Sequence, residues 1–210
     1  MALFVYKEYK YTLSVSIYIY ELCEIHLNLL FVITKRIVIS GGPGSGKTTI
    51  AEELAAIGYD IMPEISRQII LEAREQGIDQ LFLTDHLLFS KKLLEGRVQQ
   101  YKDAEKCKSP QLFYDRGIPD VNAYMDYLGA DYPDLFHEAC EQHVYDEVFL
   151  LPPWKSIYIQ DNERYESYEQ AKLIYEFLYR KYADLGYNIH NVPEGAAKER
   201  SEYILDILNL

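Results

Sequence analysis

Residues 41–48 constrain the fold of this chain more than any other segment. Their sequence, GGPGSGKT, fits the pattern GxxxxGK[ST] at every required position. Glycines let the backbone turn its N–H groups inward around phosphate groups, and a helix that begins at Lys47 adds the positive end of its dipole. Such a loop needs a strand before it and a helix after it. The β-branched run 36–40 and the helical spacing of apolar residues over 47–57 predict both.

The loop predicts a nucleotide and a metal ion as ligands. We expect Lys47, solvated before binding, to reach the β- and γ-phosphates, and the Thr48 hydroxyl to ligate Mg²⁺. The nucleotide is expected to be ATP, with GTP also possible, and a glycine-rich turn without a ligand is the alternative. The residues expected to hold the nucleotide are Gly41, Gly42, Pro43, Gly44, Ser45, Gly46, Lys47, Thr48 and Thr49.

Strand and helix patterns alternate along the rest of the chain. Short apolar runs predict four further strands, at 59–62, 111–114, 147–151 and 187–192. Helical patterns lie between and after them, at 64–76, 81–106 (one or two helices), 119–128, 132–144, 168–185 and 196–208. Five strands alternating with helices imply a parallel sheet covered on both faces, which is an α/β three-layer sandwich. A length of 210 residues suits one such domain, predicted at 35–210.

The first 34 residues have a different composition. They are rich in tyrosine and β-branched residues and contain no glycine. Charged residues interrupt every apolar run before it reaches the roughly 18 residues that a membrane span needs. No signal-peptide cleavage pattern is present. We interpret residues 1–34 as a non-essential extension; an appended strand or a membrane-touching segment is the alternative.

Charge and cysteine content exclude several partners. The formal net charge is −12, from 33 acidic and 21 basic side chains. Such a surface repels a nucleic-acid backbone and anionic lipid, so we expect no general binding to nucleic acid or to such lipid. The interrupted apolar runs of residues 1–34 give the expectation of no membrane span. Three cysteines, odd in number and without a CxxC pair, fit a reducing compartment and predict a cytoplasmic protein. Nothing in the sequence indicates the oligomeric state.

Acidic residues and arginines follow two of the predicted strands. Asp115 comes directly after an apolar strand, as a Walker B acid does, and is predicted to hold Mg²⁺ opposite Thr48; a helix N-cap is the alternative. Arg116 beside it is placed to grip a second anionic group. Glu64 follows the second strand, where the ligand crevice of an open α/β sheet lies. It could accept a proton from an acceptor hydroxyl, or form an i,i+3 salt bridge with Arg67.

A polar segment at 161–166 separates the fourth strand from the long amphipathic helix. Lids of phosphoryl-transfer enzymes bring an arginine onto the transferring group and exclude water. We interpret this segment as a lid with Arg164 as its arginine, and an ordinary exposed loop is the alternative.

Several segments, taken in order, resemble one known family. They are the loop 41–48, Pro63-Glu64 with Arg67, the run Phe113-Tyr114-Asp115-Arg116-Gly117-Ile118-Pro119-Asp120, Leu151-Pro152-Pro153-Trp154, Asp161 with Glu163-Arg164, and Gly186-Tyr187 with Val192-Pro193. Together they resemble the P-loop AAA-type ATPase/kinase family that includes the nicotinamide riboside kinase half of bacterial NadR. The resemblance covers about residues 35–208.

The resemblance implies a P-loop NTPase fold with kinase-like strand order 2-3-1-4-5, in which the Asp115 strand lies beside the loop strand. The chain also resembles deoxynucleoside and thymidylate kinases, in which an acid-Arg pair follows the third strand. That similarity implies that Glu64 is a base, that Arg116 binds substrate or phosphate, and that residues 191–193 lie near the nucleotide base. The chain lacks the sensor and ring-assembly arginines of AAA+ machines. The expected catalytic residues are Lys47, Glu64, Asp115, Arg116 and Arg164.

Two functions fit these predictions. The first is a small-molecule kinase that transfers the γ-phosphoryl group of ATP, with Mg²⁺, to a nucleoside-like hydroxyl. The second is a nucleotide-dependent binding module that hydrolyses ATP or GTP slowly. No Asn/Thr-Lys-x-Asp motif for reading guanine is present, which disfavours an ordinary GTPase. The family resemblance leaves the acceptor open.

Overall fold

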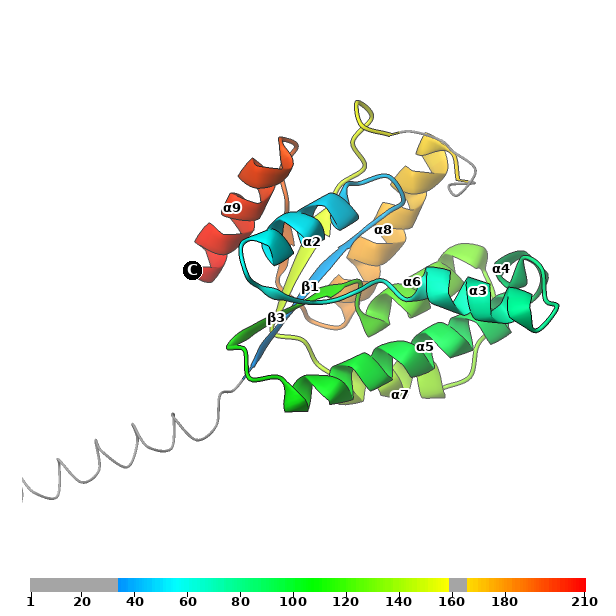
Figure 1. Ribbon diagram of the computed structural model, residues 1–210. Helices are drawn as coiled ribbons and strands as arrows, with labels where there is room; N and C mark the ends of the chain where they lie inside the picture. The colour runs from blue at the N-terminus through cyan, green and yellow to red at the C-terminus, as the bar shows by residue number, and fades with distance from the viewer. Residues whose placement is uncertain (1–33, 159–165) are drawn as a thin grey trace, which may run out of the picture. The chain divides into compact units, whose positions relative to one another are not determined.

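The computed structural model describes residues 34–158 and 166–210 of the chain. They belong to one compact unit, Thr34–Leu210. At its centre is a sheet of five strands in the order β2-β3-β1-β4-β5, and every neighbouring pair of strands is parallel (Figure 1). The predicted α/β class and the strand order 2-3-1-4-5 are confirmed.

The elements follow the chain in alternation. The strands are β1 (Lys35–Gly41), β2 (Asp60–Met62), β3 (Gln111–Asp115), β4 (Glu147–Leu151) and β5 (Ile189–Asn191). The helices are α2 (Lys47–Ala56), α3 (Ser66–Glu75), α4 (Leu81–Thr84), α5 (His86–Asp103), the short 3₁₀ helix η1 (Ala104–Lys106), α6 (Ile118–Leu128), α7 (Leu135–Gln142), α8 (Tyr168–Asp184) and α9 (Ala197–Leu208).

Side chains of the central strand alternate between two cores. Val38 points to one face, where it packs with Tyr114 and Val148 under helices α5 to α8. Ile37 and Ile39 point to the other face, which α2 and α9 cover. Since β1 is buried on both faces, its run of β-branched residues is what a central parallel strand requires. Figure 1 shows α2 and α9 together on one side of the sheet, and α5, α6 and α7 on the other.

The region 81–106, predicted as one or two helices, forms the three helices α4, α5 and η1. Asp85 ends α4 and caps α5, since its carboxylate accepts a hydrogen bond from the Leu88 N–H at 2.8 Å. The predicted fifth strand is shorter than expected, because only Ile189–Asn191 pairs with β4. The predicted long amphipathic helix is α8, whose buried residues are Ala171, Ile174, Leu178 and Tyr182.

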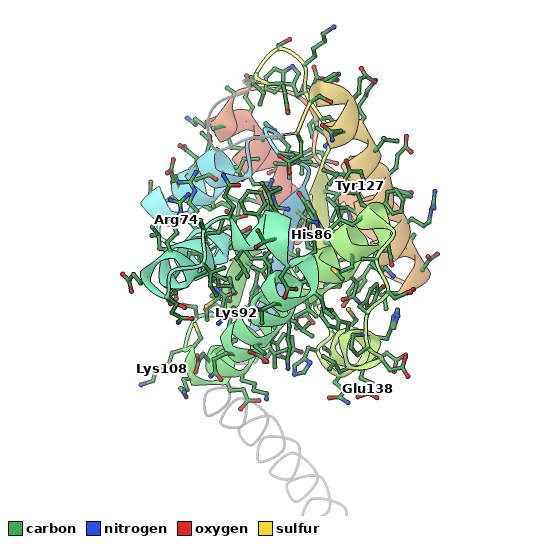
Figure 2. The ribbon with its side chains drawn as sticks, turned by 90° about the vertical axis from the view of Figure 1, so that its right-hand side faces the viewer. Arg74, His86, Lys92, Lys108, Tyr127 and Glu138 are labelled. Atoms are coloured by element: carbon green, nitrogen blue, oxygen red, sulfur yellow. The ribbon has the colours of Figure 1, made fainter. Side chains whose placement is uncertain are left out.

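The outer surfaces of the helices carry charged side chains together with exposed leucines such as Leu71 and Leu173. Arg74 on α3, His86 on α5 and Glu138 on α7 are exposed (Figure 2). None of the helices in 34–158 and 166–210 combines the length and apolar character that crossing a membrane demands.

Candidate nucleotide-binding site

The carboxyl ends of three strands meet beside the glycine-rich loop. In the sheet register, Ile39 of β1 lies opposite Asp115 of β3, and Gly41 lies opposite Leu151 of β4. The loop leaves β1 at this edge and leads into α2. Ligands of open α/β sheets bind in the crevice beyond these strand ends. The topology therefore gathers the predicted site residues that follow β1, β2 and β3.

Two glycines of the loop have conformations that other residues rarely adopt. Gly44 has φ 70° and Gly46 has φ 87°, both in the left-handed region. A Cβ at Gly46 would also lie 2.7 Å from the Arg200 Nη1 atom, and one at Gly44 would lie 2.7 Å from the Tyr158 ring. The pattern of glycines is thus a requirement of this backbone as well as of a bound phosphate.

Lys47 is buried, and the expectation that it is solvated is wrong. Only 8% of the residue is exposed, because its ammonium group folds back onto the loop. Nζ donates to the carbonyl oxygens of Gly41 at 2.9 Å and Gly42 at 2.8 Å. Burial, and next the positive charge of Arg116, lower the pKa of Lys47 to about 7, although Asp115 and Glu64 oppose this shift. The Lys47 ammonium group thus donates its hydrogen bonds to backbone carbonyls of the loop.

The two threonines after Lys47 face outward. Thr48 and Thr49 are exposed in the first turn of α2. Their hydroxyls and the N–H groups of this turn lie at the positive end of the helix, which favours an anion.

Glu64 lies between two guanidinium groups. Arg97 Nη2 is 3.0 Å from Oε1, and Arg116 Nε is 2.5 Å from Oε2. The N–H groups of Ile65 and Ser66 also donate to Oε1. Burial alone would raise the pKa of Glu64, but Arg97 and then Arg116 outweigh it and lower the pKa to about 2. Its ion-pair partners among the described residues are thus arginines distant in sequence. The salt bridge that the sequence suggested as an alternative was with Arg67.

Asp115 is the last residue of β3 and is 6% exposed. No hydrogen-bond partner within the described residues reaches its Oδ1 atom. Burial raises the pKa of Asp115, and the charges of Lys47 and Arg116 act against this rise. The alternative of a helix N-cap is wrong, because Gly117 is the N-cap of α6. A buried carboxylate oxygen without a partner is suited to a cation or to water bound to one.

The backbone of Arg116 has φ 73°, a left-handed conformation that is uncommon for a residue with a side chain. Besides its contact with Glu64, its Nη1 atom donates to the Gly41 carbonyl at 3.2 Å and lies 3.5 Å from Asp120 Oδ1. The guanidinium also lies over the Tyr124 ring, 5.5 Å from its centroid. Arg116 thus connects the loop, Glu64 and α6.

Asp120 supports this arrangement from the core. It is 1% exposed and accepts hydrogen bonds from the Ser40 hydroxyl at 2.6 Å, the Gly117 N–H at 3.0 Å and the Tyr182 hydroxyl at 2.6 Å. These contacts satisfy a charge that would otherwise be costly to bury. Asp120 therefore joins β1, α6 and α8 behind Arg116.

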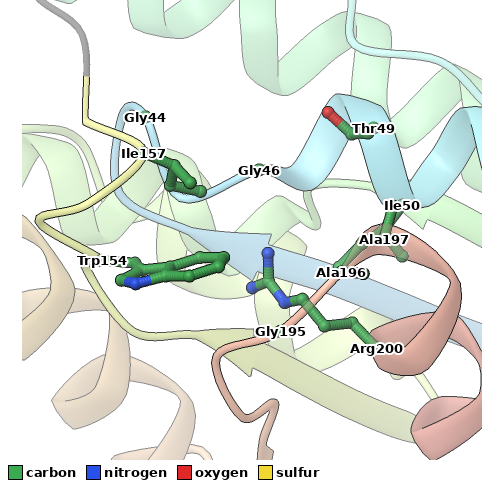
Figure 3. Close-up of a pocket in the computed structure, with 10 residues that line it drawn as sticks. All are labelled: Gly44, Gly46, Thr49, Ile50, Trp154, Ile157, Gly195, Ala196, Ala197 and Arg200. Atoms are coloured by element: carbon green, nitrogen blue, oxygen red, sulfur yellow. The ribbon is translucent and has the colours of Figure 1, made fainter.

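A pocket lies on the α9 side of the loop (Figure 3). Its volume is about 440 Å³. Arg200 projects into it from α9, with its guanidinium 5.9 Å from the Trp154 ring centroid (Figure 3). Nη1 of Arg200 donates to the Ser45 carbonyl at 3.0 Å. The remaining lining residues are Gly44, Gly46, Thr49, Ile50, Ile157, Gly195, Ala196 and Ala197.

The structure brings most of the predicted site residues to one edge of the sheet. Lys47, Glu64, Asp115 and Arg116 influence one another electrostatically there. Arg164 and the predicted lid around it lie outside the described residues. Trp154 lies beside Arg200, and Tyr124 lies beside Arg116.

Sequence reasoning assigned no role to three residues of this region: Arg97, Asp120 and Arg200. Asp120 belongs to the run after β3 that carried the family resemblance, so its place in that run was a usable signal. Arg97 and Arg200 lie in helices of mixed charge, where nothing in the sequence separates a buried arginine from an exposed one.

This parallel sheet, its strand order and its glycine-rich loop define the class of P-loop proteins with a kinase-like fold. A family model described as an AAA domain matches residues 36–200, and the chain belongs to that family. The predicted resemblance is confirmed. No curated protein sequence matches the chain.

Solved structures with this fold include several kinases. NadR in complex with NR has a TM-score of 0.67 and 18% identity, over 84% of this chain and 52% of that one, so the chain spans about half of NadR. The deoxyadenosine kinase from M. mycoides with products dCMP and dCDP has a TM-score of 0.63 and 19% identity, over 83% and 98%. The shikimate kinase from Acinetobacter baumannii in complex with shikimate has a TM-score of 0.54 and 15% identity, over 87% and 97%. At such identities the likeness is one of fold.

Proposed function

We propose that the chain is a cytoplasmic small-molecule kinase that transfers the γ-phosphoryl group of ATP to a hydroxyl of a nucleoside-like acceptor. The observation that carries this proposal is the placement of a carboxylate paired with an arginine, Glu64 with Arg116, at the sheet edge that also bears Lys47. Phosphoryl transfer needs positioning and charge neutralisation more than covalent chemistry, and this group supplies both.

The loop is the proposed site of the nucleotide phosphates. Lys47 would exchange the carbonyl oxygens of Gly41 and Gly42 for β- and γ-phosphate oxygens. The loop N–H groups and the first turn of α2, with Thr48 and Thr49, would complete the cradle.

Residues that fit Mg²⁺ lie on both sides of this cradle. The exposed Thr48 hydroxyl and the unpartnered Asp115 Oδ1 are oxygen ligands of the kind that Mg²⁺ prefers, and most of its other ligands are waters and phosphates. When bound, the ion neutralises charge on the β- and γ-phosphates. Asp115 would hold it directly or through water.

The pocket beside α9 is the proposed site of the nucleotide base. A volume of about 440 Å³ lies within the range of small-ligand sites, and its Trp154 ring and Arg200 guanidinium offer flat surfaces for stacking. It opens next to Gly44 and Gly46, so a base there continues directly into phosphates on the loop. We favour ATP, with GTP as the other purine nucleotide that could enter.

Glu64 is the proposed proton acceptor. The acceptor oxygen attacks the γ-phosphorus, ADP leaves, and the hydroxyl proton passes to Glu64. A pKa near 2 makes Glu64 a weak base but keeps it ionised at neutral pH. In a loose transition state the hydroxyl needs orientation more than early deprotonation, so an ionised and positioned carboxylate suffices. Arg116, and Arg164 from the predicted lid, would stabilise charge on the transferring group.

The kinases with similar folds support the choice of acceptor class. The described complexes of NadR and of the deoxyadenosine kinase contain NR and nucleotide products, whereas the shikimate kinase contains shikimate. Because the fold serves both chemistries, the test is a screen. Purified protein with labelled Mg·ATP is offered nucleosides, nicotinamide riboside, nucleoside monophosphates and shikimate. Transfer to a nucleoside-like compound supports the proposal; slow ATP hydrolysis with no acceptor phosphorylated would replace it with the nucleotide-dependent binding module.

A further inference from the structure

Arg97 connects the two acidic residues of the site. It lies on α5 and is 3% exposed. Nη2 donates to Glu64 Oε1 at 3.0 Å, and Nη1 donates to the main-chain oxygen of Asp115 at 3.4 Å. One guanidinium therefore spans from the segment after β2 to the end of β3.

Gly96, the residue before Arg97, lies where helix α5 comes close to the segment that carries Glu64. Gly96 lies inside α5, where glycine is less favourable than alanine by roughly 1 kcal/mol. A Cβ at Gly96 would overlap Ile65 Cδ1. An alanine here would require the flexible end of Ile65 to move, so the present fit of the helix against the segment that carries Glu64 uses a glycine. The close approach brings Arg97 within hydrogen-bonding distance of Glu64.

The two oxygens of Glu64 have different surroundings. Oε1 accepts from Arg97 Nη2, from the Ile65 N–H at 2.9 Å and from the Ser66 N–H at 3.0 Å. Oε2 meets Arg116 Nε at 2.5 Å. Because Oε1 accepts three hydrogen bonds, it has no lone pair left for an acceptor hydroxyl. Oε2 lies on the side of Arg116, which also contacts the loop.

We propose that Arg97 is a positioning residue, which holds Glu64 by Oε1 and thereby presents Oε2 to the acceptor hydroxyl. This inference rests on the proposed kinase function. Arg97 acts through Glu64 and touches neither substrate. Without it, the carboxylate rotates about its terminal bonds, and misplacement of a reacting group by about 1 Å can cost 10²-fold in rate.

A double-mutant cycle tests this role. The variants are Arg97→Met, Glu64→Gln and the double variant, with Arg180→Met as the control, since Arg180 is an exposed arginine on α8. We expect Arg97→Met to lower kcat by about 10- to 100-fold with an unchanged KM for ATP. In the Glu64→Gln background the same substitution should change kcat less than about threefold, because residues that act as a unit are not additive. Arg97→Lys, which keeps the charge, should recover part of the loss.

A second cycle, on stability, uses chemical denaturation of the ligand-free variants. Direct contact predicts a coupling between Arg97 and Glu64 of about tenfold in the unfolding equilibrium constant. If Arg97→Met does not fold, Arg97→Lys takes its place in both cycles. If the effects of the Arg97 and Glu64 substitutions on kcat are additive, the positioning role is wrong, even where their effects on stability are coupled. If their effects on stability are additive, the contact between Arg97 and Glu64 is itself wrong. Absence of any transfer by wild type would instead refute the kinase function, which separates the two failures.

Discussion

The Arg116 guanidinium and the Glu64 carboxylate lie side by side, with Nε 2.5 Å from Oε2. Arg116 follows β3 and Glu64 follows β2, so this contact ties together the ends of two neighbouring strands. The same guanidinium also donates to the carbonyl of Gly41, where the glycine-rich loop begins. A change at either residue therefore affects both the start of the glycine-rich loop and the ends of β2 and β3.

Lys47→Met should abolish nucleotide binding and leave the protein folded. Methionine keeps the buried aliphatic volume but removes the charge and the donors that phosphates need. A ligand at 100 times its Kd stabilises the folded state by about 2.7 kcal/mol, so millimolar Mg·ATP should raise the Tm of wild type and leave the Tm of the variant unchanged. Thermal unfolding measures this, with the exposed Lys172→Met as the control. An equal rise in Lys47→Met would show that the loop is not the nucleotide site.

Nucleotide binding should take up a proton above neutral pH. In the free protein the pKa of Lys47 is lowered to about 7, so at pH 8 the amine is mostly neutral. Phosphate oxygens favour the charged form and raise this pKa on binding. Affinity should therefore fall as pH rises through 7, and calorimetry at pH 8 in buffers of different ionisation enthalpy should detect uptake of close to one proton. Binding without proton exchange at pH 8 would contradict the burial of a neutral amine.

Glu64→Gln and Asp115→Asn should have different effects. A positioned general base contributes about 10²–10⁴ in rate, so Glu64→Gln should lower kcat on that scale with little change in nucleotide affinity. Asp115→Asn should instead weaken the Mg²⁺ dependence of both binding and turnover, because it replaces a charged oxygen ligand. Initial rates at varied Mg²⁺ separate the two effects. If Glu64→Gln retains full transfer activity, Asp115 becomes the candidate base.

Removal of residues 1–33 should leave nucleotide affinity and the Tm nearly unchanged. The first strand begins at Lys35, and its two neighbours β3 and β4 come from later in the chain. Thermal unfolding of the shortened and full chains, each with and without Mg·ATP, provides the measurement. A drop in Tm of more than about 5 °C would show that this segment contributes to the core or to the sheet.

The sheet could be predicted because its signals are local. A β-branched run next to a glycine-rich loop determines where β1 ends, and the apolar run before Asp115 does the same for β3. Their neighbours and order followed from the family resemblance rather than from any single segment. The place of the glycine-rich loop between β1 and α2 was likewise predictable, because its residues are consecutive.

The contacts around the loop could not be predicted in the same way. Lys47 is buried because three-dimensional packing folds its ammonium group onto two backbone carbonyls, and no sequence pattern encodes this. The salt bridge weighed as the alternative for Glu64 was with Arg67, three residues away, but Arg97 is 33 positions distant. Pairings of this kind depend on how helices pack on the sheet.

The hydrogen bond from Arg200 to the Ser45 carbonyl spans 155 positions of the chain. A ribosome makes the glycine-rich loop early and makes α9 late. During synthesis the loop is therefore present long before the arginine that packs over Gly46 and donates to Ser45. A nascent chain can complete the pocket beside α9 only after translation has passed Arg200, so whatever binds there can stabilise the finished domain through this pocket but not its growing precursor.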